Sequence, residues 1–126
     1  MELEFKIAEA YKSATNYPDL VIKLMAIGIE SYTVDAATTN ILYRLAGGVT
    51  VLHAGNHAPR TVAENFDPGL CRQAVKNNQQ GQTDFTGFMN GIAAAGVRFY
   101  EATLTGMRKR VQYIGFGGSY EETIAL

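Results

Sequence analysis

Cysteine is almost absent from this sequence, since Cys71 is the only one among 126 residues. An internal disulfide or a zinc site built from several thiolates is therefore excluded. Cys71 could form a nucleophile–base pair with a histidine nearby in the sequence. However, it falls on the apolar stripe of an expected helix, where cysteine is typically a small buried hydrophobe. We predict a structural cysteine and no catalytic residue.

Charge is also scarce. Charged residues make up 18% of the chain and the formal net charge is −1, against roughly 25% charged residues in an average domain. One short basic run, Arg108 to Arg110, offers only a modest electrostatic attraction to phosphates. We therefore expect no nucleic-acid partner. Few charges leave apolar surface to be covered, which favours a homodimer.

Long apolar runs are missing as well. No stretch approaches the ~18 apolar residues that span a bilayer. The first eleven residues alternate acidic and apolar side chains and lack the basic segment and apolar run of a secretory signal. We expect a cytoplasmic protein without a membrane partner.

The sequence contains an internal repeat. An offset of 68 (96 − 28 = 68), which becomes 70 after a turn, aligns glycines, tyrosines and apolar residues of the two halves. The matched pairs include Gly28 with Gly96, Tyr32 with Tyr100, and Tyr43 with Tyr113. This pattern predicts one domain, 1–126, made of pseudo-repeat 1 (1–52), a linker (53–68) and pseudo-repeat 2 (69–126).

Each pseudo-repeat has the pattern of two helices followed by strands. Thr15 and Thr83 stand where an N-cap would begin the second helix, and Gly28 and Gly96 stand where it would end. The residues that follow alternate at period two, as in strands. The fold class is therefore α+β: an antiparallel sheet, of about six strands in two meanders, with about four helices packed on it. The predicted core holds Ile7, Leu20, Val21, Leu24, Ile29, Val75, Phe88, Ile92 and Val97.

Tyrosine is the most informative residue type in the chain. Four of the seven tyrosines fall at matched strand positions, namely Tyr32, Tyr43, Tyr100 and Tyr113. Cross-strand aromatic pairs stabilise a sheet, which accounts for them structurally. If the two sheets join across a pseudo-twofold axis, the rings could also line a shared groove, and such a groove is a candidate ligand site.

The linker contains both histidines, His53 and His57. Their spacing would place them on one face of a helix, but Gly55 and Pro59 make a helix improbable, so we predict no metal site. A structureless loop of this length is often functional or wrapped on the surface. The candidate ligand-binding residues are His53, His57, Arg60, Asp67, Tyr32 and Tyr100.

Several segments resemble one known family. They are Gln80–Phe88 (QGQTDFTGF) with Ala95–Val97, Ile27–Tyr32, and Ala58–Ala63. Together they resemble the uncharacterised domain-of-unknown-function family 1398, small bacterial and phage-associated proteins that are sometimes labelled phage envelope protein. The likeness covers nearly the whole chain, although Phe99-Tyr100 stands where a tryptophan would be expected nearby. The resemblance implies a shared fold and no activity, so it transfers no site residue.

Two functions follow from these patterns. The favoured one is a non-enzymatic binding or interaction module without a cofactor, whose partner is a second copy, another protein or a small molecule. The alternative is a small-molecule-binding protein or small enzyme that uses the linker over a tyrosine-lined groove. A histidine in a deep pocket beside Cys71, Asp67 or a tyrosine hydroxyl would favour the enzyme.

Overall fold

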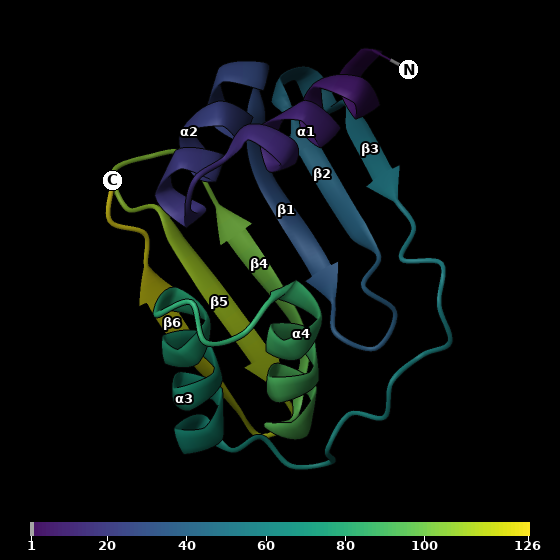
Figure 1. Ribbon diagram of the computed structural model, residues 1–126, viewed down its shortest axis with the longest axis vertical. Coiled ribbons are helices and arrows are strands. Elements are labelled where there is room, and N and C mark those ends of the chain that lie inside the picture. Colours follow the sequence, from purple (N-terminus) through teal and green to yellow (C-terminus); the bar gives the residue numbers. More distant parts are fainter. Residues whose placement is uncertain (1) are drawn as a thin grey trace.

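The computed structural model describes residues 2–126 as two helices and three strands, followed by the same series again (Figure 1). The first series is α1 (Glu2–Ser13), α2 (Tyr17–Ile27), β1 (Ile29–Asp35), β2 (Ile41–Leu45), the 3-10 turn η1 (Ala46–Gly48) and β3 (Thr50–His53). The second is α3 (Pro68–Gln79), α4 (Phe85–Ala94), β4 (Val97–Thr103), β5 (Arg110–Gly115) and β6 (Gly118–Thr123). None of the helices within 2–126 combines the length and apolar character that crossing a bilayer requires.

The strands form one open antiparallel sheet in the order β3-β2-β1-β4-β5-β6. The predicted α+β class, with six strands in two meanders and four helices, is therefore confirmed. The two series meet at the pairing of β1 with β4, where Tyr32 lies opposite Ala102 and Val34 opposite Tyr100. These positions exchange under the offset of 68, and Thr33 lies opposite its own counterpart, Glu101 (101 − 33 = 68). A pseudo-twofold axis through the Thr33–Glu101 pair accounts for this register.

All four helices lie on one face of the sheet (Figure 1). Side chains alternate between the faces of a strand, so every second residue points under the helices. Every residue of the predicted core is buried there, including Val21, Leu24, Ile92 and Val97, which have essentially no exposed surface. The opposite face carries polar side chains, among them Arg44, whose Nη1 donates to Thr33 Oγ1 at 2.6 Å. Any enclosed site must therefore lie on the helical face.

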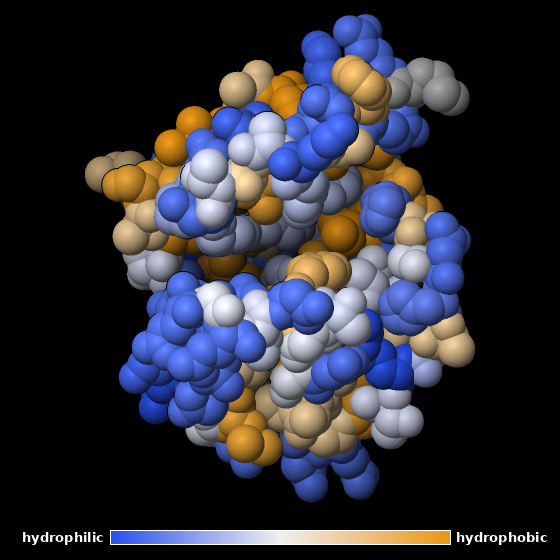
Figure 2. Space-filling view, in the orientation of Figure 1, coloured by the Kyte–Doolittle hydropathy of each residue, from blue (hydrophilic) through white to orange (hydrophobic). Residues whose placement is uncertain are grey.

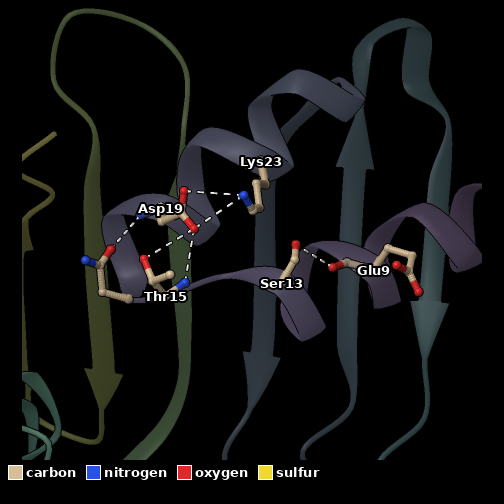
Figure 3. Close-up of polar contacts among 6 residues, drawn as sticks. Glu9, Ser13, Thr15, Asp19 and Lys23 are labelled. Atoms are coloured by element: carbon tan, nitrogen blue, oxygen red, sulfur yellow. Dashed lines mark hydrogen bonds and ion pairs between the residues drawn. The ribbon is translucent and has the colours of Figure 1, made fainter.

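The helix starts differ by one residue from the prediction. Thr15 and Thr83 do not cap α2 and α4; the caps are Asn16 and Asp84, whose side chains accept a backbone N–H three residues later, at 2.9 Å and 2.7 Å. The Thr15 backbone N–H instead donates to Asp19 Oδ2 at 3.0 Å (Figure 3). Asparagine and aspartate rank at least as high as threonine at the N-cap, so the neighbouring residue is favoured at each helix start.

Residues 54–67 wrap around the sheet edge and one end of the molecule (Figure 1). Backbone N–H groups fasten this segment: that of Arg60 donates to the Ala37 carbonyl at 2.8 Å, and that of Asp67 donates to the Ala95 carbonyl at 2.8 Å. The segment passes directly over Gly96, the glycine that ends the second helix pair with a left-handed φ of +83°. This crossing covers one end of the second helix pair, whereas Gly28 at the matching end of the first pair has no neighbour within 4 Å of an added Cβ.

Candidate ligand-binding cavity

A cavity of about 670 Å³ lies between the helix pair α1–α2 and the helix pair α3–α4. Figure 2 shows the hollow between the two pairs, with hydrophilic side chains around its rim. The sheet forms its floor, with lining residues from β1, β2, β4, β5 and β6. The cavity therefore lies at the junction of the two pseudo-repeats.

The floor of the cavity is made by the sheet. Tyr32 and Val34 come from β1, Tyr100 from β4, and Val111 and Tyr113 from β5. The tyrosines of neighbouring strands pair as the sequence predicts: the ring centroids of Tyr32 and its partner on β2 are 5.7 Å apart, and those of Tyr100 and Tyr113 are 5.2 Å apart. The floor is thus aromatic and aliphatic.

The walls repeat the same positions twice. The end of α1 and the start of α2 contribute three wall residues, and the corresponding parts of α3 and α4 contribute their counterparts at an offset of 68. The pairs are Tyr11 with Gln79, Tyr17 with Phe85, and Leu20 with Phe88. The sequence predicted Leu20 and Phe88 as core residues, and it named none of these wall residues as ligand-binding candidates.

In the first pseudo-repeat the two wall tyrosines form hydrogen bonds with tyrosines of the sheet. The hydroxyls of Tyr17 and Tyr32 share a hydrogen bond of 2.7 Å. The hydroxyl of Tyr43 donates to that of Tyr11 at 3.0 Å. The buried phenols of Tyr32 and Tyr43 thus each have a hydrogen-bond partner within the protein, as buried polar groups usually do.

In the second pseudo-repeat the same two bonds are missing. Phe85 replaces the wall tyrosine that would reach Tyr100, and Gln79 replaces the one that would reach Tyr113. Neither floor hydroxyl has a hydrogen-bonding partner among residues 2–126, and neither oxygen is sealed from the solvent. Two phenol hydroxyls are therefore left available to a molecule in the cavity.

Exchanging tyrosine and phenylalanine at the equivalent wall positions should affect stability differently in the two halves. We expect Tyr17→Phe to lower the free energy of unfolding by about 1 kcal/mol, because the hydroxyl of Tyr32 loses its partner. Phe85→Tyr should leave stability unchanged or raise it by up to about 1 kcal/mol, because it supplies Tyr100 with that bond. Urea unfolding of the two variants measures both effects. Equal destabilisation by both would contradict the assigned equivalence.

The tyrosines of the cavity stay uncharged at neutral pH. Burial raises the pKa of Tyr17 to about 12, and it raises the pKa of Tyr32 and of Tyr100 well above the ordinary value. One carboxylate also lines the cavity, that of Glu122 on β6, and it accepts a hydrogen bond from the Tyr120 hydroxyl. The cavity thus offers neutral phenols and one acid.

The linker residues proposed from the sequence lie away from this cavity. Tyr32 and Tyr100 line it, but His53, His57, Arg60 and Asp67 do not. His53 is the exposed last residue of β3, and His57 Nε2 lies 3.0 Å from Thr39 Oγ1. Arg60 Nη1 donates to the same Thr39 oxygen at 2.7 Å, and Asp67 caps α3. The structure therefore brings two of the six candidates together at the cavity and uses others to hold the linker.

Cys71 is fully buried on α3. Burial, reinforced by the negative charge of Glu122, raises the pKa of its thiol to about 12. A reactive cysteine needs an accessible, stabilised thiolate, and Cys71 has the opposite environment. Across residues 2–126 there is also no group of three or more His, Cys, Asp or Glu side chains placed to hold a metal ion.

Comparison with known proteins adds a family but no activity. The sequence profile described as "Protein of unknown function (DUF1398)" matches residues 5–120. No curated protein matches the sequence significantly.

Proposed function

The chain belongs to DUF1398, and we propose that this protein is a non-enzymatic small-molecule-binding protein. The family is described without a function, so the proposal depends on the cavity. The ligand occupies the space between the two helix pairs. The observation that carries the proposal is a cavity lined by five tyrosines, two of which keep hydroxyls without a protein partner.

The size and chemistry of the cavity support a ligand rather than a packing gap. Ligand pockets commonly measure ~300–1,000 Å³ and combine apolar walls with a few polar groups, and this cavity measures about 670 Å³. Tyrosine rings present flat apolar surface at little cost in side-chain entropy, and each hydroxyl fixes orientation. The free hydroxyls of Tyr100 and Tyr113 are the groups that would do so here.

The side chains around the cavity favour binding over catalysis. Its described lining contains one carboxylate, Glu122, and neither a histidine nor a cysteine. General acid–base and nucleophilic catalysis both need a proton acceptor beside the reacting group. The phenols, whose pKa burial raises, are poor bases at neutral pH. Glu122 could accept a proton, but the described lining gives it no histidine or cysteine to act with.

A titration with a neutral aromatic alcohol, 2-(1-naphthyl)ethanol, tests the proposal. We expect the ligand to change the chemical shifts of protein amides in β1, β4, β5 and the starts of α2 and α4, as seen in a ¹⁵N–¹H NMR spectrum. The dissociation constant should be on the order of 1 mM or lower for a ligand of this size. Shifts confined to the linker or to the open face of the sheet would refute the cavity as the site.

Two variants on one strand sharpen this test. Val111→Trp fills the floor of the cavity and should abolish binding, whereas Ile114→Trp adds the same side chain to the other face of β5 and should not. If Val111→Trp fails to fold, Leu20→Phe is the substitute, because phenylalanine already occupies the equivalent wall position at Phe88. It narrows the cavity and should weaken binding.

A further inference from the structure

The charge of the cavity points to the class of ligand, an inference that rests on the proposed function. Among the described residues that line it, Glu122 is the only acid, and no lysine, arginine or histidine faces it. The faces of the aromatic rings add to the negative potential, because the face of a π system carries partial negative charge. The starts of α2 and α4 also face the cavity, and the side chains of Asn16 and Asp84 cap their backbone N–H groups. With no basic side chain among its described lining, the cavity favours cations over anions.

Glu122 is available to such a ligand. Its carboxylate has no ion-pair partner among residues 2–126, although the neighbouring Glu121 pairs with Arg108 and Arg110 on the other face of β6. The hydroxyl of Tyr120 donates to one of its oxygens, Oε2. The guanidinium of Arg72 lies over the Tyr120 ring, 5.6 Å from its centroid, but forms no ion pair with Glu122. A partly enclosed carboxylate without a direct ion pair has an electrostatic reason to bind a cation.

The acid lies beside the free phenols. Glu122 pairs with Val111 and Tyr120 pairs with Tyr113, so Glu122 and Tyr113 lie on the same, helix-covered face of the sheet. The ring of Tyr113 is in turn 5.2 Å from that of Tyr100. The carboxylate and the two unpaired hydroxyls thus belong to one half of the cavity, and all three can accept N–H bonds from an ammonium group.

Among its described residues, the first pseudo-repeat contributes no second acid to the cavity lining. By strand register the counterpart of Glu122 is His53, because His53 pairs with Ile41 as Glu122 pairs with Val111. His53 is exposed and does not line the cavity. Only one end of the cavity is therefore built to hold a charge.

We propose that the ligand is an organic amine in its protonated form. Its ammonium group binds at Glu122 with the hydroxyls of Tyr100 and Tyr113, and its apolar body lies against the tyrosine and phenylalanine rings. Aromatic faces attract cations as well as apolar groups, so both parts of the molecule are accommodated.

Three probes that share one aromatic body test the charge preference. They are 2-(1-naphthyl)ethylamine, 2-(1-naphthyl)ethanol and the anion of 1-naphthaleneacetic acid, and each is titrated by NMR as above. We expect the amine to bind about tenfold more tightly than the alcohol, because one charge-assisted interaction is added. The carboxylate should bind most weakly. Glu122→Gln should reduce the affinity for the amine to that for the alcohol and leave the alcohol unaffected.

Glu121→Gln is the matched control, since it removes the same charge from the adjacent residue on the opposite face. It should leave the preference for the amine intact. If the alcohol binds in the cavity and the amine binds no more tightly, or if Glu122→Gln leaves the amine unaffected, the cation inference is wrong and the binding proposal stands. If neither the amine nor the alcohol binds, both are wrong.

Discussion

Gly96→Ala is expected to lower the free energy of unfolding by about 3–5 kcal/mol, the combined cost of left-handed backbone strain and overpacking. Gly96 has a φ of +83°, and a Cβ there would lie 2.3 Å from the carbonyl oxygen of Asn65 and 2.9 Å from Cα of Phe66. Both contacts are with backbone that crosses the helix end, so rotating a side chain cannot relieve them. Thermal and urea unfolding followed by circular dichroism measure the loss.

Gly28→Ala is the matched control for this variant. Gly28 ends the first helix pair at the equivalent position with a φ of +108°, and nothing lies within 4 Å of an added Cβ. Only the backbone strain remains, so a loss of about 1–2 kcal/mol is expected. Similar losses at the two glycines would show that the linker does not press on Gly96 as described.

Raising the pH above about 10 should unfold the protein in one steep transition. Burial is the main cause that raises the pKa of Tyr32, Tyr100 and Tyr113 well above the ordinary value near 10. Above pH 10 the unfolded chain loses these phenolic protons while the folded chain keeps them. Each such tyrosine then lowers the free energy of unfolding by about 1.4 kcal/mol per pH unit, so the three together lower it by about 4 kcal/mol per pH unit. A typical stability of ~5–15 kcal/mol is lost within a few pH units.

Tyrosinate absorbance at 295 nm and far-ultraviolet circular dichroism, recorded together, test this expectation. Burial is the main cause that raises the pKa of six of the seven tyrosines, all except Tyr120. Most of the increase in absorbance should therefore accompany the loss of structure. Tyr100→Phe removes one titrating group without breaking a hydrogen bond, so its transition should move to higher pH and become less steep. Ionisation of several tyrosines near pH 10 in a protein with native circular dichroism would contradict the burial described.

The sequence predicted much of the architecture because the repeat samples each element twice. Apolar periodicity and the glycines Gly28 and Gly96 located the second helices, and both glycines have the left-handed φ expected of them. The tyrosine pairs across neighbouring strands were likewise predicted and found. The N-caps were misplaced by one residue, because two suitable capping residues stand side by side at each helix start.

Only part of the candidate site could be predicted from the sequence. Tyr32 and Tyr100 could be identified because they recur at strand positions, and they line the cavity. The part played by Tyr11, Tyr17 and Glu122 depends on how the two helix pairs are spaced over the sheet, which no local pattern encodes. The linker attracted attention because it lies outside the repeat, yet the polar contacts of His57 and Arg60 hold the linker against the turn that follows β1.

The register of β1 against β4 has a consequence for how a ligand would sit. The pseudo-twofold axis passes through the Thr33–Glu101 pair beside the cavity floor, and two identical units around it would give a cavity with interchangeable ends. Within one chain the ends differ: the hydroxyls of Tyr17 and Tyr32 bond to each other at one end, while Glu122 and two unpaired phenols remain at the other. Because both units belong to one chain, their sequences can differ, and the two ends of an otherwise symmetric cavity carry different side chains. A bound molecule should adopt one orientation in it, with a single set of bound-state signals instead of two.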